Sequence, residues 1–176
     1  KRVIGVARFS NREARASLEA HGVECIACDL LDRGAVLKLP NVADGVRNCV
    51  FMAGHKCGAA DNASLTWMMN VGVPMTVADI FRDMRIVSFS TACVYPFVPV
   101  DGPGADEATP STPPAGDYAN SCVGRERMFE YGSRAWGTPG RMVRLSYAID
   151  MRYGVLYDVA STVFAGQSPD LTMGHA

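Results

Sequence analysis

Short apolar segments alternate with stretches of helical periodicity along the 176-residue chain, and this alternation restricts the possible folds most strongly. We expect strands over 2–7, 23–30, 49–53, 85–90 and 141–145, and helices over 11–20, 33–39, 64–70, 74–82, 118–134 and 154–165. Apolar strands of this length separated by helices are typical of a parallel sheet with helices on its faces. The sequence therefore predicts an α/β fold.

Prolines and apolar periodicity refine this expectation. Pro40 is expected to end the helix at 33–39, and Pro74 to kink or restart the helical stretch from 64 to 82. Residues 96–114 hold six of the ten prolines, which predicts a long loop, and loops of that length are usually functional. In the last helix, we expect the side chains of Val155, Val159, Val163 and Phe164 to face inward.

Composition excludes several classes of protein. The net charge is −1, so there is no basic surplus to drive nucleic-acid binding. No apolar run is long enough for a membrane span, which favours a cytoplasmic protein without a membrane partner. With 48% hydrophobic residues the chain can bury an ordinary core, and we expect one domain over 1–176. The six cysteines are expected as free thiols, and the three histidines show no metal-ligand spacing.

Ligands of open α/β sheets bind beyond the carboxyl ends of the strands, so the residues after each predicted strand deserve inspection. Arg8 and Ser10 follow the first strand, where a dinucleotide-binding sheet often holds an acid that pairs with ribose hydroxyls. A guanidinium binds a phosphate with two parallel hydrogen bonds, which favours the 2′-phosphate of NADP over NAD. The alternative interpretation of Arg8 is a solvated surface arginine.

Several segments, taken in order, resemble the extended short-chain dehydrogenase/reductase family, the NAD(P)-dependent epimerases and dehydratases of nucleotide sugars. The resemblance covers nearly the whole chain and implies a Rossmann-like domain. Asp29-Leu30 is similar to the pair that contacts adenine in that family. Phe51-Met52-Ala53-Gly54-His55-Lys56 resembles a turn in which small residues, here Ala53 and Gly54, let the cofactor approach and the lysine meets its phosphates. Asn70-Val71-Gly72 resembles a helical segment whose asparagine is mainly structural.

The resemblance also implies a catalytic pair. Ser88-Phe89-Ser90-Thr91-Ala92-Cys93-Val94-Tyr95 resembles the segment with the catalytic serine or threonine, which places Thr91 in that role. Tyr118 resembles the tyrosine of Y-x-x-x-K. A hydroxyl and a phenol can both hydrogen-bond one substrate oxygen, and a phenolate can accept its proton while hydride passes to nicotinamide. The alternative for Tyr118 is an aromatic side chain that packs at a helix start.

Two departures from the family pattern limit this interpretation. Cys122 stands where the family has the lysine that lowers the pKa of the tyrosine. Arg125, about two turns from Tyr118 on a similar helix face, is a candidate electrostatic substitute. In addition, no strand with a G-x-x-G-x-x-G loop precedes Lys1, and that strand is central in the family's sheet. We therefore expect a gap in the sheet and a partial domain from a longer chain, with most of the substrate domain absent.

The reaction and partners are less constrained. Ala92 and Cys93 stand where 4,6-dehydratases have an acidic pair, which disfavours dehydration and leaves epimerisation or carbonyl/alcohol redox chemistry. Ser146 and Arg152 lie where the family meets its substrate, a small molecule of the nucleotide-sugar class. By analogy with the family, a homodimer is expected through the helices around 64–82 and 118–134. The rival hypothesis is a non-catalytic module that binds NAD(P) or senses its redox state.

Overall fold

The computed structural model describes residues 1–56, 62–146 and 152–170. Its strands are β1 (Ile4–Ala7), β2 (Glu24–Ala27), β3 (Asn48–Phe51), β4 (Arg85–Thr91) and β5 (Gly140–Leu145). Its α-helices are α1 (Arg12–Ala20), α2 (Arg33–Val36), α3 (Leu39–Val42), α4 (Ala63–Trp67), α5 (Val73–Ile80), α6 (Asp117–Trp136) and α7 (Val155–Phe164). A π-helical turn, η1 (Met68–Gly72), joins α4 to α5, and a 3-10 turn, η2 (Ala92–Val94), follows β4. The predicted α/β fold is confirmed.

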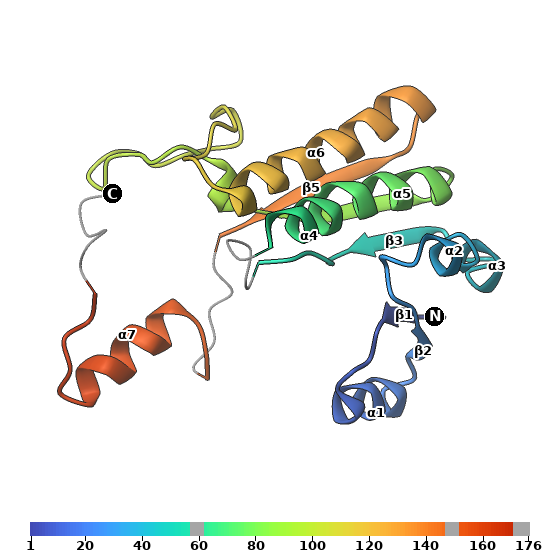
Figure 1. The fold of residues 1–176 in the computed structure, drawn as a ribbon, viewed down its shortest axis with the longest axis horizontal. Coiled ribbons are helices and arrows are strands. Elements are labelled where there is room, and N and C mark those ends of the chain that lie inside the picture. Colours follow the sequence, from blue (N-terminus) through green and yellow to red (C-terminus); the bar gives the residue numbers. More distant parts are fainter. Residues whose placement is uncertain (57–61, 147–151, 171–176) are drawn as a thin grey trace.

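All strand pairs in the described residues are parallel, but they form two sheets rather than one (Figure 1). One sheet pairs β1 with β2, and Ile4 lies opposite Glu24. The other has the order β3-β4-β5, and Val87 of β4 lies between Val50 and Arg141. No ladder joins β1 to β3 in this part of the chain, so the sheet is interrupted where the resemblance to the family implies a missing strand.

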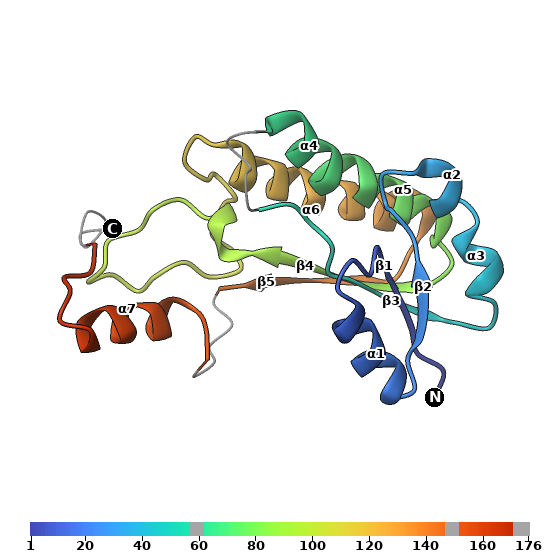
Figure 2. The same cartoon turned by 60° about the horizontal axis from the view of Figure 1, so that its bottom comes forward.

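Helices cover the three-stranded sheet on one face. Figure 2 shows α4, α5 and α6 on one side of β4 and β5, with α1 and α7 on the other side. The first apolar cluster has Phe51, Val73 and Val77 at its centre, and the second has Cys28, Val36 and Leu39. Because side chains alternate along a strand, β4 buries Ile86, Ser88 and Ser90 toward α5 and α6 and leaves Val87 and Phe89 only partly buried.

The two prolines act in different ways. Pro74 lies in the first turn of α5, directly after η1. Since it has no N–H to donate to the Asn70 carbonyl one turn earlier, the helix widens into a π-turn there, which is the predicted kink. The expectation that Pro40 ends a helix is wrong. Pro40 lies in the first turn of α3, where a missing N–H costs no hydrogen bond.

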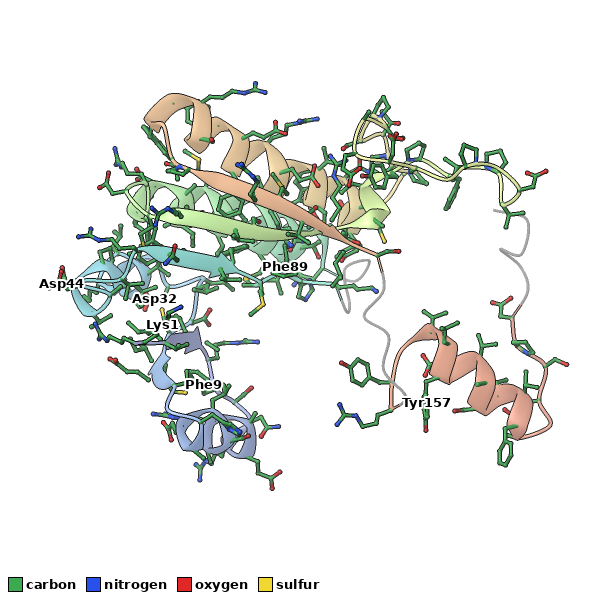
Figure 3. All side chains as sticks on the ribbon, turned by 180° about the vertical axis from the view of Figure 1, so that it is seen from behind. Lys1, Phe9, Asp32, Asp44, Phe89 and Tyr157 are labelled. Carbon is green, nitrogen blue, oxygen red and sulfur yellow. The ribbon has the colours of Figure 1, made fainter. Side chains whose placement is uncertain are left out.

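The expected inward face of the last helix is also wrong. In α7, the side chains of Val155, Val159, Val163 and Phe164 are all exposed, Phe164 by 96%. No described residue of α7 is buried. Figure 3 labels Tyr157 on this helix, which lies apart from the sheets, whereas Phe9 lies close to α1 at the other end of the molecule. Helical periodicity correctly predicted a helix here, but it could not show whether another part of the chain covers its apolar face.

Free thiols belong to Cys25, Cys28, Cys49, Cys93 and Cys122, and Cys57 lies outside the described residues. Within the same part of the chain, no helix is both long enough and apolar enough to cross a membrane.

A buried ion pair joins α6 to the edge strand β5. The Glu126 side chain is 1% exposed, and its Oε1 accepts hydrogen bonds from Ser90 Oγ at 2.6 Å and from Arg144 Nε at 3.0 Å. Its Oε2 accepts a bond from Arg144 Nη2 at 2.8 Å. The hydrogen bond to Glu126 raises the pKa of Arg144 further above its ordinary value, against the opposing effect of burial. Because the Glu126 carboxylate is buried and both of its oxygens accept hydrogen bonds, the loss of either partner leaves a buried polar group unpaired.

We therefore predict that Arg144→Ala lowers the free energy of unfolding by about 3–5 kcal/mol, because it leaves a buried carboxylate without its counter-charge. The matched control is Arg127→Ala, which breaks an exposed pair with Glu130 at 2.8 Å and should cost about 1 kcal/mol or less. Urea titrations of the three proteins measure both losses. Equal losses in the two variants would contradict the prediction.

Candidate active site

The structure brings Thr91 and Tyr118 together at the carboxyl end of β4. Thr91 is the last residue of β4, and its Oγ1 accepts a hydrogen bond from Cys93 N at 3.2 Å, which caps η2. Tyr118 is the second residue of α6, the helix that packs on β4. The Thr91 hydroxyl lies close enough to Tyr118 to act on the pKa of its phenol, which it lowers. Residues 27 positions apart in the chain thus present two hydroxyl groups to the same place.

The surroundings of Tyr118 favour the protonated phenol. Its pKa is raised above the ordinary value, mainly by burial and then by the neighbouring Cys122, while the hydrogen bond to Thr91 acts in the opposite direction. The pKa of the Cys122 thiol is raised as well, because its burial outweighs the lowering effect of Arg125. Both groups are therefore neutral near pH 7, and α6 gives Tyr118 no cation at the position one turn further along.

The turn after β3 is fixed by one buried amide. Asn70 of η1 is fully buried, and its Oδ1 accepts a hydrogen bond from His55 N at 2.9 Å. Its Nδ2 donates to His55 O at 3.0 Å and to Ser121 Oγ at 2.9 Å. Asn70 thereby ties both backbone groups of His55 to α6, in agreement with the structural role that the sequence implies.

Arg125 is directed toward this same turn. Its side chain is 7% exposed, its Nη2 donates to Asn70 Oδ1 at 2.6 Å, and its Nη1 donates to Phe89 O at 3.0 Å. Its Nε is buried and has no hydrogen-bond partner among the residues that the structure describes. These contacts place the guanidinium between β3, β4 and η1, and its proposed electrostatic role toward Tyr118 stays a prediction.

Three sequence-predicted residues belong to the turn itself. Ala53 is partly buried, and Gly54 approaches Arg125 so closely that a side chain there would overlap the guanidinium. Lys56 is exposed, and its Nζ lies 5.9 Å from the centroid of the Tyr118 ring. The turn after β3 therefore reaches the same hydroxyl pair as β4 and α6.

The other predicted cofactor residues lie after the strands of the smaller sheet. Arg8 and Ser10 follow β1 and are exposed. Asp29 follows β2, and its Oδ1 accepts a hydrogen bond from Leu31 N at 3.0 Å, which leaves its other oxygen for a ligand. Leu30 packs against both apolar clusters and is only partly exposed.

This donor set fits a dinucleotide. The exposed cations Arg8 and Lys56 suit phosphates, and the carboxylate of Asp29 suits hydroxyl groups. Gly54 has no side chain, so the backbone of the turn is exposed at this position. All of these residues follow strands whose carboxyl ends are the binding edge of an open parallel sheet.

The predicted substrate residues lie farther along the chain. Ser146 directly follows β5 and is exposed, and Arg152 is exposed just before α7. Residues 147–151 between them lie outside the described residues, and α7 stands apart from the sheets in Figure 1.

Sequence reasoning missed the buried partners Ser90, Ser121 and Glu126. A usable signal exists, because Tyr118, Cys122 and Glu126 recur at four-residue spacing on one face of α6. A charged residue in such an inward stripe indicates a buried ion pair, and Arg144 lies on the neighbouring strand.

A separate pocket of about 280 Å³ lies between α6 and the first residues of β4 and β5, lined by Ile86, Ser88, Phe129 and Met142 among others. It is at the opposite end of β4 from Thr91, so it is not part of the candidate active site. No group of three or more potential metal ligands occurs within residues 1–56, 62–146 and 152–170.

Comparisons with known proteins give a family and a fold. A family model described as the NAD dependent epimerase/dehydratase family matches residues 1–149. No curated protein matches the chain.

Three solved structures illustrate the similarity in fold. The enzyme WbmG from Bordetella bronchiseptica, in complex with NAD, is 18% identical, with a TM-score of 0.75 over 94% of this chain and 52% of that one. A dTDP-glucose 4,6-dehydratase double mutant, DesIV from Streptomyces venezuelae, with NAD and DAU bound, is 21% identical, with a TM-score of 0.73 over 94% and 53%. UDP-glucuronic acid 4-epimerase from Bacillus cereus, in complex with NAD, is 13% identical, with a TM-score of 0.71 over 94% and 56%. The chain thus spans about half the length of these structures.

The contact between Gly54 and Arg125 generates a prediction. A Cβ at Gly54 would overlap Arg125 Nη2 and lie 3.1 Å from Asn70 Oδ1, so Gly54→Ala should destabilise the fold by about 1–3 kcal/mol. In an Arg125→Ala background the overlap is gone, and the same substitution should cost little. Urea titrations of the four proteins in this double-mutant cycle measure the coupling. Additive effects would show that the two residues do not interact as described.

Proposed function

The chain belongs to the NAD-dependent epimerase/dehydratase family, and from this premise we propose that it forms the dinucleotide-binding part of an oxidoreductase or epimerase that acts on a hydroxylated, nucleotide-sugar-like small molecule. The observation that carries the proposal is the hydroxyl pair of Thr91 and Tyr118 at the carboxyl end of β4. Its support is the placement of further dinucleotide-type donors after β1, β2 and β3.

The proposed chemistry follows from the two hydroxyl groups. Thr91 holds the reacting oxygen of the substrate by a hydrogen bond, and the phenolate of Tyr118 accepts its proton as a general base. A bound nicotinamide dinucleotide supplies the hydride acceptor. Partial burial of Tyr118 raises the pKa of the phenol, so activation needs a positive charge nearby.

The proposed cofactor contacts extend along the strand ends. Arg8 and Ser10 hold a phosphate near the ribose, which favours NADP, although the three solved relatives named above contain NAD. Asp29 and Leu30 border the adenosine. Ala53, Gly54 and Lys56 form the turn beside the phosphates or the nicotinamide ribose, with Arg125 positioning Gly54 from within.

The proposed reaction is epimerisation or alcohol oxidation rather than 4,6-dehydration. Ala92 and Cys93 of η2 follow Thr91 directly, and neither is a carboxylic acid like the acidic pair that dehydratases carry at these positions. Ser146 and Arg152 are proposed substrate contacts, with Arg152 suited to an anionic group. A homodimer through α4, α5 and α6 and a cytoplasmic location complete the proposal.

A second candidate function is a non-catalytic module that binds NAD(P). The observation that favours it is the buried, neutral thiol of Cys122 beside Tyr118. This module would bind the dinucleotide without turning over any sugar nucleotide.

Replacing the proton acceptor separates these two functions. Tyr118→Phe should abolish turnover of nucleotide sugars while NAD(P) affinity, measured by calorimetry, stays the same, because only the hydroxyl is removed. Tyr131→Phe is the matched control, since Tyr131 is on the same helix and is 54% exposed. Turnover in Tyr118→Phe equal to that of the control would exclude Tyr118 as the base.

The raised pKa of Tyr118 sets the pH dependence. The base works as phenolate, so turnover should rise with pH through the neutral range, about tenfold per pH unit while the pH stays below the pKa. Cys122→Lys adds a cation that favours the phenolate, so the rising limb should move to lower pH. Initial rates across pH for both proteins test this. A pH profile unchanged by Cys122→Lys would contradict the assignment, and an active variant of an inactive parent would favour the non-catalytic module.

A further inference from the structure

Tyr118 is surrounded by groups from three elements. Cys122 faces it from α6, Thr91 and Cys93 come from the end of β4 and from η2, and Lys56 comes from the turn after β3. The two thiols and the threonine hydroxyl bring no positive charge. Within the described part of the chain, Lys56 is the residue that brings a cation to the Tyr118 ring.

The position of Lys56 lets its ammonium interact with Tyr118. Its Nζ lies 5.9 Å from the ring centroid, within the distance at which an ammonium is attracted to an aromatic face. The side chain is exposed, and its four-carbon stem is flexible, so the ammonium can move from the ring toward the phenol oxygen. Its attraction to a full negative charge exceeds that to a neutral ring, so the cation favours the ionised form.

The other nearby cations are engaged elsewhere. The guanidinium of Arg125 bonds to Asn70 and to the carbonyl of Phe89. Arg144 is paired with Glu126. Both are held by buried partners, whereas Lys56 contacts the ring itself.

We propose that Lys56, from the turn after β3, supplies the cation that stabilises the Tyr118 phenolate in this chain, where α6 carries Cys122 one turn beyond the tyrosine. The inference rests on the proposed function, in which Tyr118 accepts a proton. Lys56 acts through Tyr118: its charge stabilises the phenolate, and it does not itself accept or donate the proton. It is therefore a positioning residue.

The test is an ultraviolet titration of the Tyr118 phenol, which needs neither cofactor nor turnover. Each protein is titrated against its own Tyr118→Phe partner, so that the difference isolates this tyrosine from the other five. The variants are Lys56→Ala, Lys56→Arg, which keeps the charge, and Lys38→Ala as a control that removes another exposed lysine.

The midpoint for Tyr118 should rise by about half a pH unit in Lys56→Ala, as expected when a phenolate loses the attraction of a solvent-exposed ammonium about 6 Å away. It should stay near the parent value in Lys56→Arg and in Lys38→Ala. An unchanged midpoint in Lys56→Ala, or an equal rise in Lys38→Ala, would overturn the proposal.

The titration and turnover separate this inference from the proposed function. A midpoint that rises in Lys56→Ala while Tyr118→Phe still turns over substrate supports the role of Lys56 and rejects Tyr118 as the base. A midpoint that does not move while Tyr118→Phe is inactive rejects Lys56 and keeps the proposed function.

Discussion

The buried amide of Asn70 is the interaction on which the candidate active site depends. Both of its donors and its acceptor are used, by the backbone of His55, by Ser121 and by Arg125. A buried amide with every group satisfied specifies one arrangement, because any shift would leave a polar atom unpaired in the interior. The π-turn before Pro74 places this amide between β3 and α6. The turn that carries Gly54 and Lys56 is therefore held in register with the helix that carries Tyr118.

This linkage bears on the electrostatics of the site. Burial raises the pKa of the Cys122 thiol, so Cys122 brings no charge at neutral pH, and burial also disfavours the Tyr118 phenolate. A cation that stabilises the phenolate has to come from another element, and the turn after β3 is the element fixed by Asn70. The position of the charge and the position of the base then depend on one hydrogen-bond network, while the Glu126–Arg144 pair independently anchors α6 to β5.

Local sequence signals predicted most elements but not what packs against them. Strand positions, the parallel pairing and the long helix α6 follow from apolar periodicity, whereas the interrupted sheet was implied by the resemblance to the family. Asn11 caps α1 by accepting a hydrogen bond from Ala14 N at 3.0 Å. Pro40 was assigned wrongly, because a proline is compatible with a helix start as well as with a helix end. The exposure of Phe164 and the burial of Glu126 could not be predicted, since each depends on which surface, if any, covers the helix. The proximity of Thr91 and Tyr118 was implied by the resemblance to the family, whereas the contact of Lys56 with the tyrosine ring depends on three-dimensional geometry.

The proposed function requires that the carboxyl ends of the parallel strands hold a nicotinamide dinucleotide with its reactive ring facing Thr91 and Tyr118. A crystal structure of the protein with NAD decides this. We expect the nicotinamide beside the two hydroxyl groups, Lys56 within reach of Tyr118, and the adenosine toward Asp29. NAD bound elsewhere, for example in the pocket between α6 and β5, or a nicotinamide turned away from Tyr118, would contradict it.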